Sequence, residues 1–385
     1  MNKFINILNS WHHTPQYIIG IMTGTSLDGI DTALCRIHTI DTTITLELCE
    51  YMCYEYPSEI KKEIQFLLNE PSPISIYSHI HHELSRVYAQ CVRQLCSSAK
   101  FDIQTISAIG IHGQTLWHDP QQQRCTLQAG NGEVLAKILS IPVVSDFRSA
   151  DVALGGTGAP LVPIFDKEFF SSDTNTHIAL NIGGMANITV LPPRHSATPV
   201  IACDTGPGNV LIDALCMKYY NVPFDTEGKY AHNGLLIQEL LQELQNHPFY
   251  KTPLPKSTGR EVFGQQYADF LCDSFSNHHP NNLIRTVTEL TAWHITDHIQ
   301  RLSDNPHTVI VAGGGKHNIF LMNRLQELLP QTLFCSSESF GINADAKEAM
   351  CFAYLSYRTL SGLPSNIPSV TGASREAVLG SISLP

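Results

Sequence analysis

The chain has 385 residues and 43% hydrophobic content, enough to build a packed core in each of two domains. Its net charge is −11, and it has 24 basic residues without any run of Lys or Arg. This composition argues against nucleic-acid binding and against attraction to an acidic membrane, so we expect a small-molecule ligand.

The cysteines and the amino terminus indicate the compartment. The 11 cysteines are scattered and odd in number, without CxxC spacing, which predicts neither a disulfide framework nor a zinc site. They are interpreted as reduced core thiols. The first 13 residues hold too short an apolar stretch for a secretory signal, and no later stretch reaches the length of a membrane span. We therefore expect a cytoplasmic protein.

The predicted elements of the first half follow the order βββαβαβ. Hydrophobic periodicity predicts strands at 17–21, 31–37 and 43–56, helices at 58–69 and 75–99, a strand at 106–111, a helix at 133–139 and a strand at 142–145. A turn rich in glycine and hydroxyl groups separates the first two strands. Its bare backbone N–H groups can approach phosphate oxygens.

The second half repeats this order, and its glycine-rich turn lies about 160 residues after the first. We expect strands at 178–182, 188–191, 200–203 and 308–312, and helices at 209–220, 237–245 and 285–302. Each half then forms a mixed sheet flanked by helices, with ligands at the carboxyl ends of strands. Two such turns predict phosphates clamped between like domains.

The Pro/Gly-dense segment between the halves sets the predicted domain boundaries. We expect an N-terminal domain of residues 1–150 plus 360–385, a C-terminal domain of 151–359, and a crossover or hinge at 150–165. In the tail, 346–359 is predicted as a helix and 377–379 as a strand that returns to one of the sheets.

Six sequence blocks together carry a specific resemblance that spans nearly the whole chain. The blocks are MTGTSLDGID at 22–31, GIHGQT at 110–115, DFR at 146–148 through GGTGAPLVP at 155–163, NIGGMAN at 181–187, CDTGPGN at 203–209 and AGGGKHN at 312–318. In this order they resemble the anhydro-N-acetylmuramic acid kinases, members of the actin-like ATPase and sugar-kinase superfamily.

The resemblance implies a fold and an activity. The fold is α/β, with two actin-like (ribonuclease H-like) domains and an interdomain cleft. In the implied reaction, water opens the 1,6-anhydro ring of anhydro-N-acetylmuramic acid, and the freed 6-oxygen takes the γ-phosphoryl group of ATP with Mg²⁺ as cofactor. The product is N-acetylmuramic acid 6-phosphate, an intermediate of peptidoglycan recycling. A homodimer is expected at the level of the family.

Two carboxylates are candidates for catalysis. Asp204 ends a predicted strand before a Gly-Pro-Gly turn and is the candidate base for water; alternatively, it only accepts N–H bonds of that turn. Glu348 is the candidate that orients the base or the water. Because Asp345 to Glu348 fits a capping box, Glu348 can equally serve only the helix start.

The glycine-rich turns supply the candidate nucleotide contacts. In the first turn Ser26 and Asp28 offer groups to the phosphates, and Asp28 is the candidate Mg²⁺ ligand, although Asp28-Gly29 is also a hairpin signal. The family analogy assigns the glycines at 313–315 to adenosine. The full candidate set is Gly24, Thr25, Ser26, Leu27, Asp28, Gly29, Asn181, Gly183, Gly184, Asn187, Gly313, Gly314 and Gly315.

Polar residues after buried strands are candidates for holding the sugar. Arg148 suits the lactyl carboxylate because its guanidinium binds carboxylates in a bidentate manner. Alternatively, Asp146, Arg148 and Asp151 form a surface ion-pair cluster, His112 is a core histidine, and Asn209 only caps a helix. The candidates are His112, Thr115, Asp146, Arg148, Asp151, Gly206 and Asn209.

Two other functions compete with the kinase. A slowly turning actin-like ATPase that closes on a protein partner would share the phosphate turns but would not need the polar 146–163 segment. A hydrolase with Thr25 or Ser26 as nucleophile would need a neighbouring base, and the local sequence offers none. The histidines at 79–82 lack HExxH spacing, so we interpret them as a solvated helix face.

Overall fold

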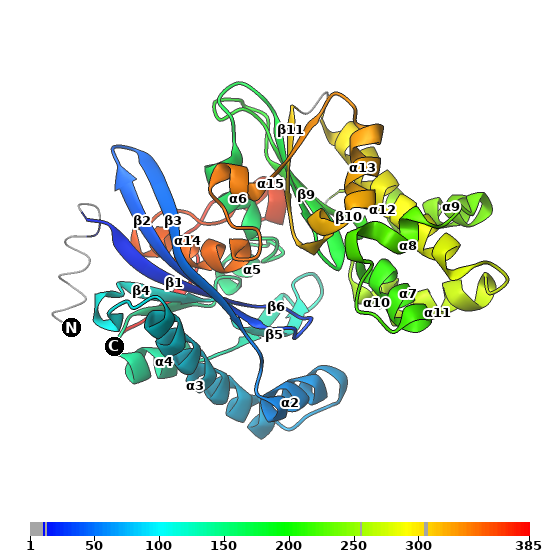
Figure 1. Cartoon of the computed structure of the whole chain (residues 1–385). Helices are drawn as coiled ribbons and strands as arrows, with labels where there is room; N and C mark the ends of the chain where they lie inside the picture. Colours follow the sequence, from blue (N-terminus) through cyan, green and yellow to red (C-terminus); the bar gives the residue numbers. More distant parts are fainter. Residues whose placement is uncertain (1–10, 12–13, 255, 304–306) are drawn as a thin grey trace. The chain divides into compact units, whose positions relative to one another are not determined.

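The computed structural model divides the chain into two compact units, each of which is described by itself. The first comprises Met1–Glu168 and Gly341–Pro385, and the second is the continuous segment Phe169–Phe340. The structure describes residues 11, 14–254, 256–303 and 307–385. The second unit is thus inserted into the sequence of the first, as the colours in Figure 1 show.

A six-stranded mixed sheet organises the first unit. The strand order is β13-β7-β4-β1-β2-β3, with β2 antiparallel to both β1 and β3, and with β4 and β7 parallel to β1. The strands are β1 (Gln16–Thr23), β2 (Ile30–Ile40), β3 (Thr43–Tyr54), β4 (Ala108–Ile111), β7 (Val143–Ser145) and β13 (Ser381–Ser383). The parallel strands β1, β4 and β7 therefore end at one edge of the sheet.

Helices cover both faces of this sheet. Ile19 and Ile21 of β1 pack with Leu84 and Tyr88 of a long helix, α3, in one apolar core. The opposite face carries helix α14, which contacts β1, β2 and β4. The helices are α2 (Ser58–Asn69), α3 (Ile74–Ser98), α4 (Gly132–Leu139), α5 (Ser149–Ala153), α6 (Val162–Phe170), α14 (Lys347–Leu360), α15 (Pro368–Thr371) and the 3₁₀ turn η1 (Ile103–Thr105), beside a hairpin of β5 (Gln114–Asp119) and β6 (Cys125–Ala129).

Two glycines allow α14 to lie directly on the sheet. Gly20 of β1 and Gly110 of β4 are register partners. A Cβ at Gly20 would overlap the Ala349 carbonyl oxygen, and one at Gly110 would overlap backbone and side-chain atoms of the same helix. Glycine is required at both positions because the helix backbone occupies the space of a side chain.

The second unit repeats the strand order of the first. Its sheet runs β10-β9-β8-β11-β12, with the first three strands antiparallel and β11 and β12 parallel to β8. The strands are β8 (His177–Ile182), β9 (Met185–Leu191), β10 (Ile201–Pro207), β11 (Thr308–Ala312) and β12 (Leu333–Ser336). The expected class, two ribonuclease H-like mixed sheets flanked by helices, is confirmed.

The long helix α12 holds the core of the second unit together. Its Ala292, Ile295 and Ile299 pack on Ile178 and Leu180 of β8. The helices are α7 (Val210–Tyr220), α8 (Lys229–His232), α9 (Gln238–Gln245), α10 (Arg260–Phe263), α11 (Gln265–Ser274), α12 (Pro280–Leu302) and α13 (Ile319–Leu328), with 3₁₀ turns η2 (Thr226–Gly228), η3 (Pro248–Lys251), η4 (Gly314–His317) and η5 (Ser337–Phe340).

The boundaries of the two compact units differ from the expected domain boundaries at two places. The first unit continues to Glu168, beyond the expected end at residue 150, and it resumes at Gly341. Helix α14 therefore belongs to the first unit, where its backbone is seated on Gly20 and Gly110. The final strand lies at Ser381–Ser383, paired with β7, so the prediction of a strand at 377–379 was wrong by a few residues.

Two further expectations concern the cysteines, expected to be reduced core thiols, and the helices, none of which was expected to span a membrane. All 11 cysteines are free, and most are buried, but Cys49 and Cys53 are exposed on β3 and are not core thiols. Among the described residues, no helix is long and apolar enough to cross a membrane.

Candidate functional site

Three polar side chains form a row across the second sheet. Asp204 of β10 lies opposite Asn187 of β9, and Asn187 lies opposite Asn181 of β8. Directly opposed residues of antiparallel strands project from the same face, so these three side chains are neighbours. All three are partly exposed. The structure thus brings the candidate base together with two candidate nucleotide-binding residues.

The carboxylate of Asp204 is held from outside its own turn. Its Oδ2 accepts a hydrogen bond of 2.9 Å from the backbone N–H of Thr258, 54 residues further along the chain. The Asp204 N–H donates to the Lys256 carbonyl over 3.2 Å. The interpretation of Asp204 as a stabiliser of its own Gly-Pro-Gly turn is therefore wrong, and the segment that holds it was missed.

Burial raises the pKa of Asp204 to about 6. The hydrogen bond from Thr258 lowers this pKa, and the negative charge of Glu261 raises it. A β-bulge between Asp204 and Gly206 locally re-aims the strand at this point. A partly exposed carboxylate that titrates near neutrality matches the requirement for a general base.

The glycine turn beside this row is tied to the start of α7. The N–H groups of Gly208 and Asn209 donate to the carbonyls of Gly184 and Gly183, respectively, over 2.8 Å each. Asn209 Nδ2 donates to the Ile182 carbonyl over 3.3 Å, and its side chain makes no capping hydrogen bond. Asn209 does occupy the N-cap position of α7, as the capping interpretation expected, but its side chain holds the β8–β9 turn instead of capping the helix.

The three glycines after β11 have different roles. Gly313 has a φ of 81° and, like Gly315, lies against Ile182, where a Cβ would collide. Gly314 and Gly184 are exposed, and a Cβ on either would meet no atom closer than 4.0 Å. Packing therefore explains the outer two glycines of the triplet, while Gly184 and Gly314 present open backbone.

Gly206 also has a packing role. Its φ is 148°, and a Cβ there would lie 3.0 Å from the ring of His294 and 3.1 Å from the ring of Tyr250. Gly206 is buried against these rings, so the structure does not place it among exposed groups that could contact the sugar.

In the first unit, the turn between β1 and β2 presents the other candidate phosphate contacts. Gly24, Thr25, Ser26 and Asp28 are partly or fully exposed. Leu27, by contrast, is buried in the core with a φ of 55° and so anchors the turn. Gly29 is also buried, and a Cβ there would overlap the Cys53 sulfur.

His112 links this turn to Arg148 and has no free ring nitrogen. Arg148 Nε and Nη2 donate to His112 Nε2 over 3.0 and 2.8 Å, so the ring proton lies on Nδ1, which donates to the Thr23 carbonyl over 3.3 Å. Burial and the Arg148 charge hold the His112 pKa well below its usual value. Burial lowers the pKa of Arg148 to about 10, against the opposing charge of Glu348.

The remaining sugar candidates occupy different environments. Asp146 is exposed with a φ of 54°, and Thr115 is partly exposed on β5. Asp151 is fully buried: its carboxylate accepts bonds of 2.8 Å each from Gly158 N, Asn366 Nδ2 and Thr371 Oγ1. Among the described residues no ion pair joins Asp146, Arg148 and Asp151, so the predicted surface ion-pair cluster does not form.

Glu348 lies in the first turn of α14, which begins without a capping box. The N-cap position is Ala346, and Asn343 Oδ1 accepts the N–H groups of Asp345 and Ala346. Glu348 is exposed, but protein atoms crowd its carboxyl, and desolvation raises its pKa. Lys347 opposes this rise, and Asp31 and Asp28 add to it, so Glu348 shares its electrostatic environment with the first turn.

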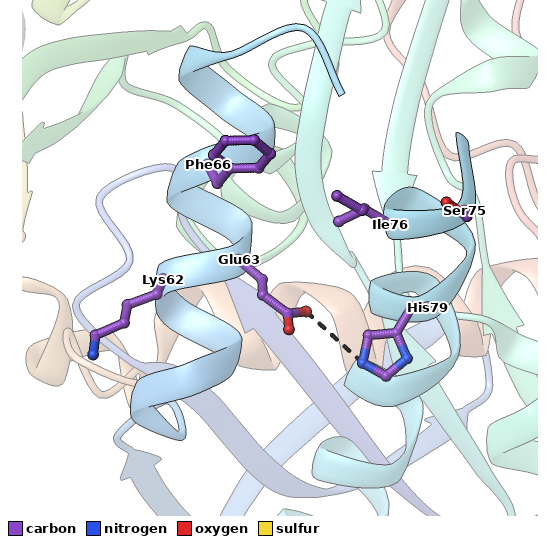
Figure 2. Close-up of a pocket in the computed structure, with 6 residues that line it drawn as sticks. All are labelled: Lys62, Glu63, Phe66, Ser75, Ile76 and His79. Carbon is purple, nitrogen blue, oxygen red and sulfur yellow. Dashed lines mark ion pairs between the residues drawn. The ribbon is translucent and has the colours of Figure 1, made fainter. Parts of the chain in front are cut away.

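Two surface hollows of the structure are not lined by any candidate residue. Figure 2 shows the first, about 470 Å³, between α2 and α3, where His79 Nε2 lies 3.8 Å from Glu63 Oε2 and Phe66 faces Ile76. The second, about 430 Å³, is lined by α10 and α11 residues including Arg260 and Glu261. No cluster of metal-ligating side chains occurs in the part of the chain that the structure describes, including the histidines at 79–82.

Comparison with known proteins identifies the family. The family model of anhydro-N-acetylmuramic acid kinase matches residues 16–385. Proteins of that name from Bacillus cereus and Bacillus thuringiensis are each 38% identical over 380 residues, covering 96% of this chain and 99% of each relative. A solved structure, (R)-2-hydroxyglutaryl-CoA dehydratase component A from Acidaminococcus fermentans, gives a TM-score of 0.47 at 12% identity, covering 90% of this chain and 99% of that one. On the sequence matches, the chain belongs to the anhydro-N-acetylmuramic acid kinase family and is a kinase.

Proposed function

We propose that this enzyme hydrolytically opens 1,6-anhydro-N-acetylmuramic acid and phosphorylates its 6-oxygen with ATP. The observation that carries the proposal is the family match over residues 16–385. The products are N-acetylmuramic acid 6-phosphate and ADP. The proposed setting is peptidoglycan recycling in the cytoplasm by a homodimer; this setting rests on the family resemblance.

Asp204 is the proposed base. It takes a proton from water as the water oxygen bonds to the anomeric carbon, and the bond from that carbon to the bridging oxygen breaks. The freed 6-oxygen bonds to the γ-phosphorus while the bond to the ADP oxygen breaks. Because burial raises the pKa of Asp204 only to about 6, most of the carboxylate is ionised at pH 7 and can accept the proton.

The proposed nucleotide contacts come from the glycine-rich turns of both units. In the second unit, the open backbone at Gly184 and Gly314, with the partly exposed Gly183, Asn181 and Asn187, supports binding of the phosphates and adenosine. In the first unit, Gly24, Thr25, Ser26 and Asp28 offer exposed donors and one carboxylate. The buried Leu27, Gly29 and Gly315 and the closely packed Gly313 are proposed to shape these turns.

Mg²⁺ is the proposed cofactor, and Asp28 is its candidate ligand. Mg²⁺ commonly binds through one or two carboxylates together with substrate phosphates and water. The exposed Asp28 carboxylate fits that requirement, and its charge acts on both Asp31 and Glu348. When bound, the ion would neutralise charge on the phosphates.

The proposed sugar contacts are Arg148, Asp146, Thr115 and Asn209. Arg148 remains charged at neutral pH and is fixed by His112 and the Gly158 carbonyl, which supports recognition of the lactyl carboxylate. His112, Asp151 and Gly206 are proposed to act through the residues they hold. Glu348 is proposed to orient the reacting water.

A direct assay tests the proposal. Purified protein is incubated with Mg²⁺, ATP and 1,6-anhydro-N-acetylmuramic acid, and products are followed by phosphorus NMR and mass spectrometry. We expect ADP and a phosphosugar in equal amounts, with the phosphosugar heavier than the substrate by one phosphoryl group and one water. ATP hydrolysis that is indifferent to the sugar would instead favour an actin-like ATPase.

A second experiment tests the role of Asp204. We expect Asp204→Asn to abolish phosphosugar formation and to leave nucleotide affinity, measured by calorimetry, within a few-fold of wild type. An amide cannot accept the proton of the attacking water, but it closely preserves the side chain's size and shape. Full turnover by this variant would exclude Asp204 as the base.

A further inference from the structure

We propose that the segment 256–259, which we call the strap, is a positioning element that fixes and tunes the Asp204 carboxylate. This inference rests on the proposed role of Asp204 as base. The strap grips Asp204 at two points: the Thr258 N–H donates to Oδ2 over 2.9 Å, and the Lys256 carbonyl accepts the Asp204 N–H over 3.2 Å. Together the two bonds fix both the strand and the side chain.

The strap is itself anchored. Lys256 Nζ donates to the Phe249 carbonyl over 3.3 Å and lies 4.5 Å from the centre of the Phe249 ring. The neighbouring Tyr250 stacks on His294 of α12, with ring centres 5.7 Å apart. Both of these rings also lie against Gly206. The strap and the bulge that carries Asp204 therefore pack on the same group of rings, Phe249, Tyr250 and His294.

The hydrogen bond from Thr258 has a direct chemical consequence. A donor to a carboxylate stabilises its charged form, whereas burial favours the neutral form. The Thr258 N–H lowers the pKa of Asp204 against the larger effect of burial, and Glu261, two residues after the strap, raises it. Thr258 in the strap and Glu261 just after it therefore shift the pKa of Asp204 in opposite directions.

The buried titratable groups next to Asp204 do not change their charge near pH 7. Burial raises the pKa of Cys203 to about 12 and that of Tyr250 well above its usual value, and it lowers the pKa of His294 to about 3. These three groups are therefore neutral at pH 7. Burial also lowers the pKa of Lys256, whose charge acts on Cys203.

Three variants test the strap in the intact, ligand-free protein. Thr258→Pro deletes the N–H donor, Thr258→Ala keeps it, and Glu261→Gln removes the opposing charge. The readout is the titration of the Asp204 carboxyl by carbon-13 NMR, with the signal assigned by its loss in Asp204→Asn. We expect Thr258→Pro to raise the midpoint by about one pH unit, a tenfold change in the protonation equilibrium. Glu261→Gln should lower it, and Thr258→Ala should leave it unchanged.

The results separate this inference from the proposed function. If the NMR midpoints shift as expected and the acid limb of kcat/KM shifts with them, both stand. If the midpoints shift but the acid limb does not, the strap stands and Asp204 is not the base. An unchanged midpoint in a folded Thr258→Pro protein overturns the strap. Should the proline variant not fold, the same test is made on protein in which an ester oxygen replaces the Thr258 N–H, and an unchanged midpoint there overturns the strap equally.

Discussion

At the scale of single residues, Glu348 combines exposure with a crowded carboxyl. Desolvation raises its pKa, with Asp31 and Asp28 adding to the rise and Lys347 opposing it. We expect Glu348→Gln to reduce kcat roughly 100-fold, the lower end of the range for a positioned acid–base side chain. Steady-state kinetics would measure the loss, and Glu376→Gln, an exposed carboxylate elsewhere on the first unit, is the control. A wild-type kcat for Glu348→Gln would leave this side chain without a role in the reaction.

His294 makes the stability of the second unit dependent on pH. Its Nε2 donates to the Pro207 carbonyl over 2.9 Å, and burial lowers its pKa to about 3, against about 6.5 in an unfolded chain. Between these values the unfolded chain binds a proton that the folded chain does not, so stability falls as pH falls below about 6.5. At pH 5 the loss attributable to His294 is on the order of 2 kcal/mol.

The contribution of His294 is isolated by comparing how much stability wild type and a His294 variant each lose between pH 7 and pH 5. Urea unfolding at pH 7 and pH 5 should show a smaller pH-dependent loss for His294→Leu than for wild type, whatever the absolute stability of the variant. Equal losses in the two proteins would show that His294 does not remain neutral in the folded state at pH 5.

At the scale of elements, α14 depends on two glycines of the sheet beneath it. Because a Cβ at Gly20 would overlap the Ala349 carbonyl oxygen, Gly20→Ala must push the helix away from β1. We expect a loss of about 3 kcal/mol in the free energy of unfolding, the upper part of the usual range for overpacking. Gly184→Ala is the stability control, since a Cβ there meets no atom within 4 Å. Similar midpoints in thermal melts of the two variants would contradict this seating of α14.

Sequence periodicity predicted the elements that have strong apolar patterns and missed those that do not. The structure confirms, within a few residues, the helices at 58–69 and 75–99 and the antiparallel strands β1 to β3 and β8 to β10. The hairpin β5–β6 and the edge strands β12 and β13 were missed or displaced, because mixed polar segments such as Gln114–Asp119 are fixed by pairing and not by their own pattern. The unit to which α14 belongs was likewise invisible, since only long-range packing on Gly20 and Gly110 decides it.

The candidate site shows the same division. Asp204, Asn187 and Asn181 were predicted from strand ends and turns, and the structure places them in one row. The contact from Thr258 was not predicted, because it joins residues 54 positions apart. The small and polar residues at 256–259 were the signal for a loop, but nothing in them indicated its partner.

At the scale of the whole molecule, the two units differ in how many segments of the chain each needs in order to fold. The second unit is the continuous segment Phe169–Phe340 with its own sheet, whereas the first needs two separate segments. The later segment supplies α14, which covers one face of the first sheet, and β13, which pairs with β7. The segment 169–340 therefore contains all the strands of its sheet, while 1–168 lacks one strand and a major helix of its own unit.

This inequality predicts how fragments behave. Expressed alone, 169–340 should fold and melt cooperatively, because its apolar core is complete. The fragment 1–168 should lack a cooperative transition by circular dichroism, because the glycine-lined face of its sheet has no helix to cover it, and co-expression with 341–385 should restore one. A cooperative melt of 1–168 alone would show that α14 is dispensable for the first sheet, whereas failure of 169–340 to fold would show that the second unit needs the rest of the chain despite its continuous core.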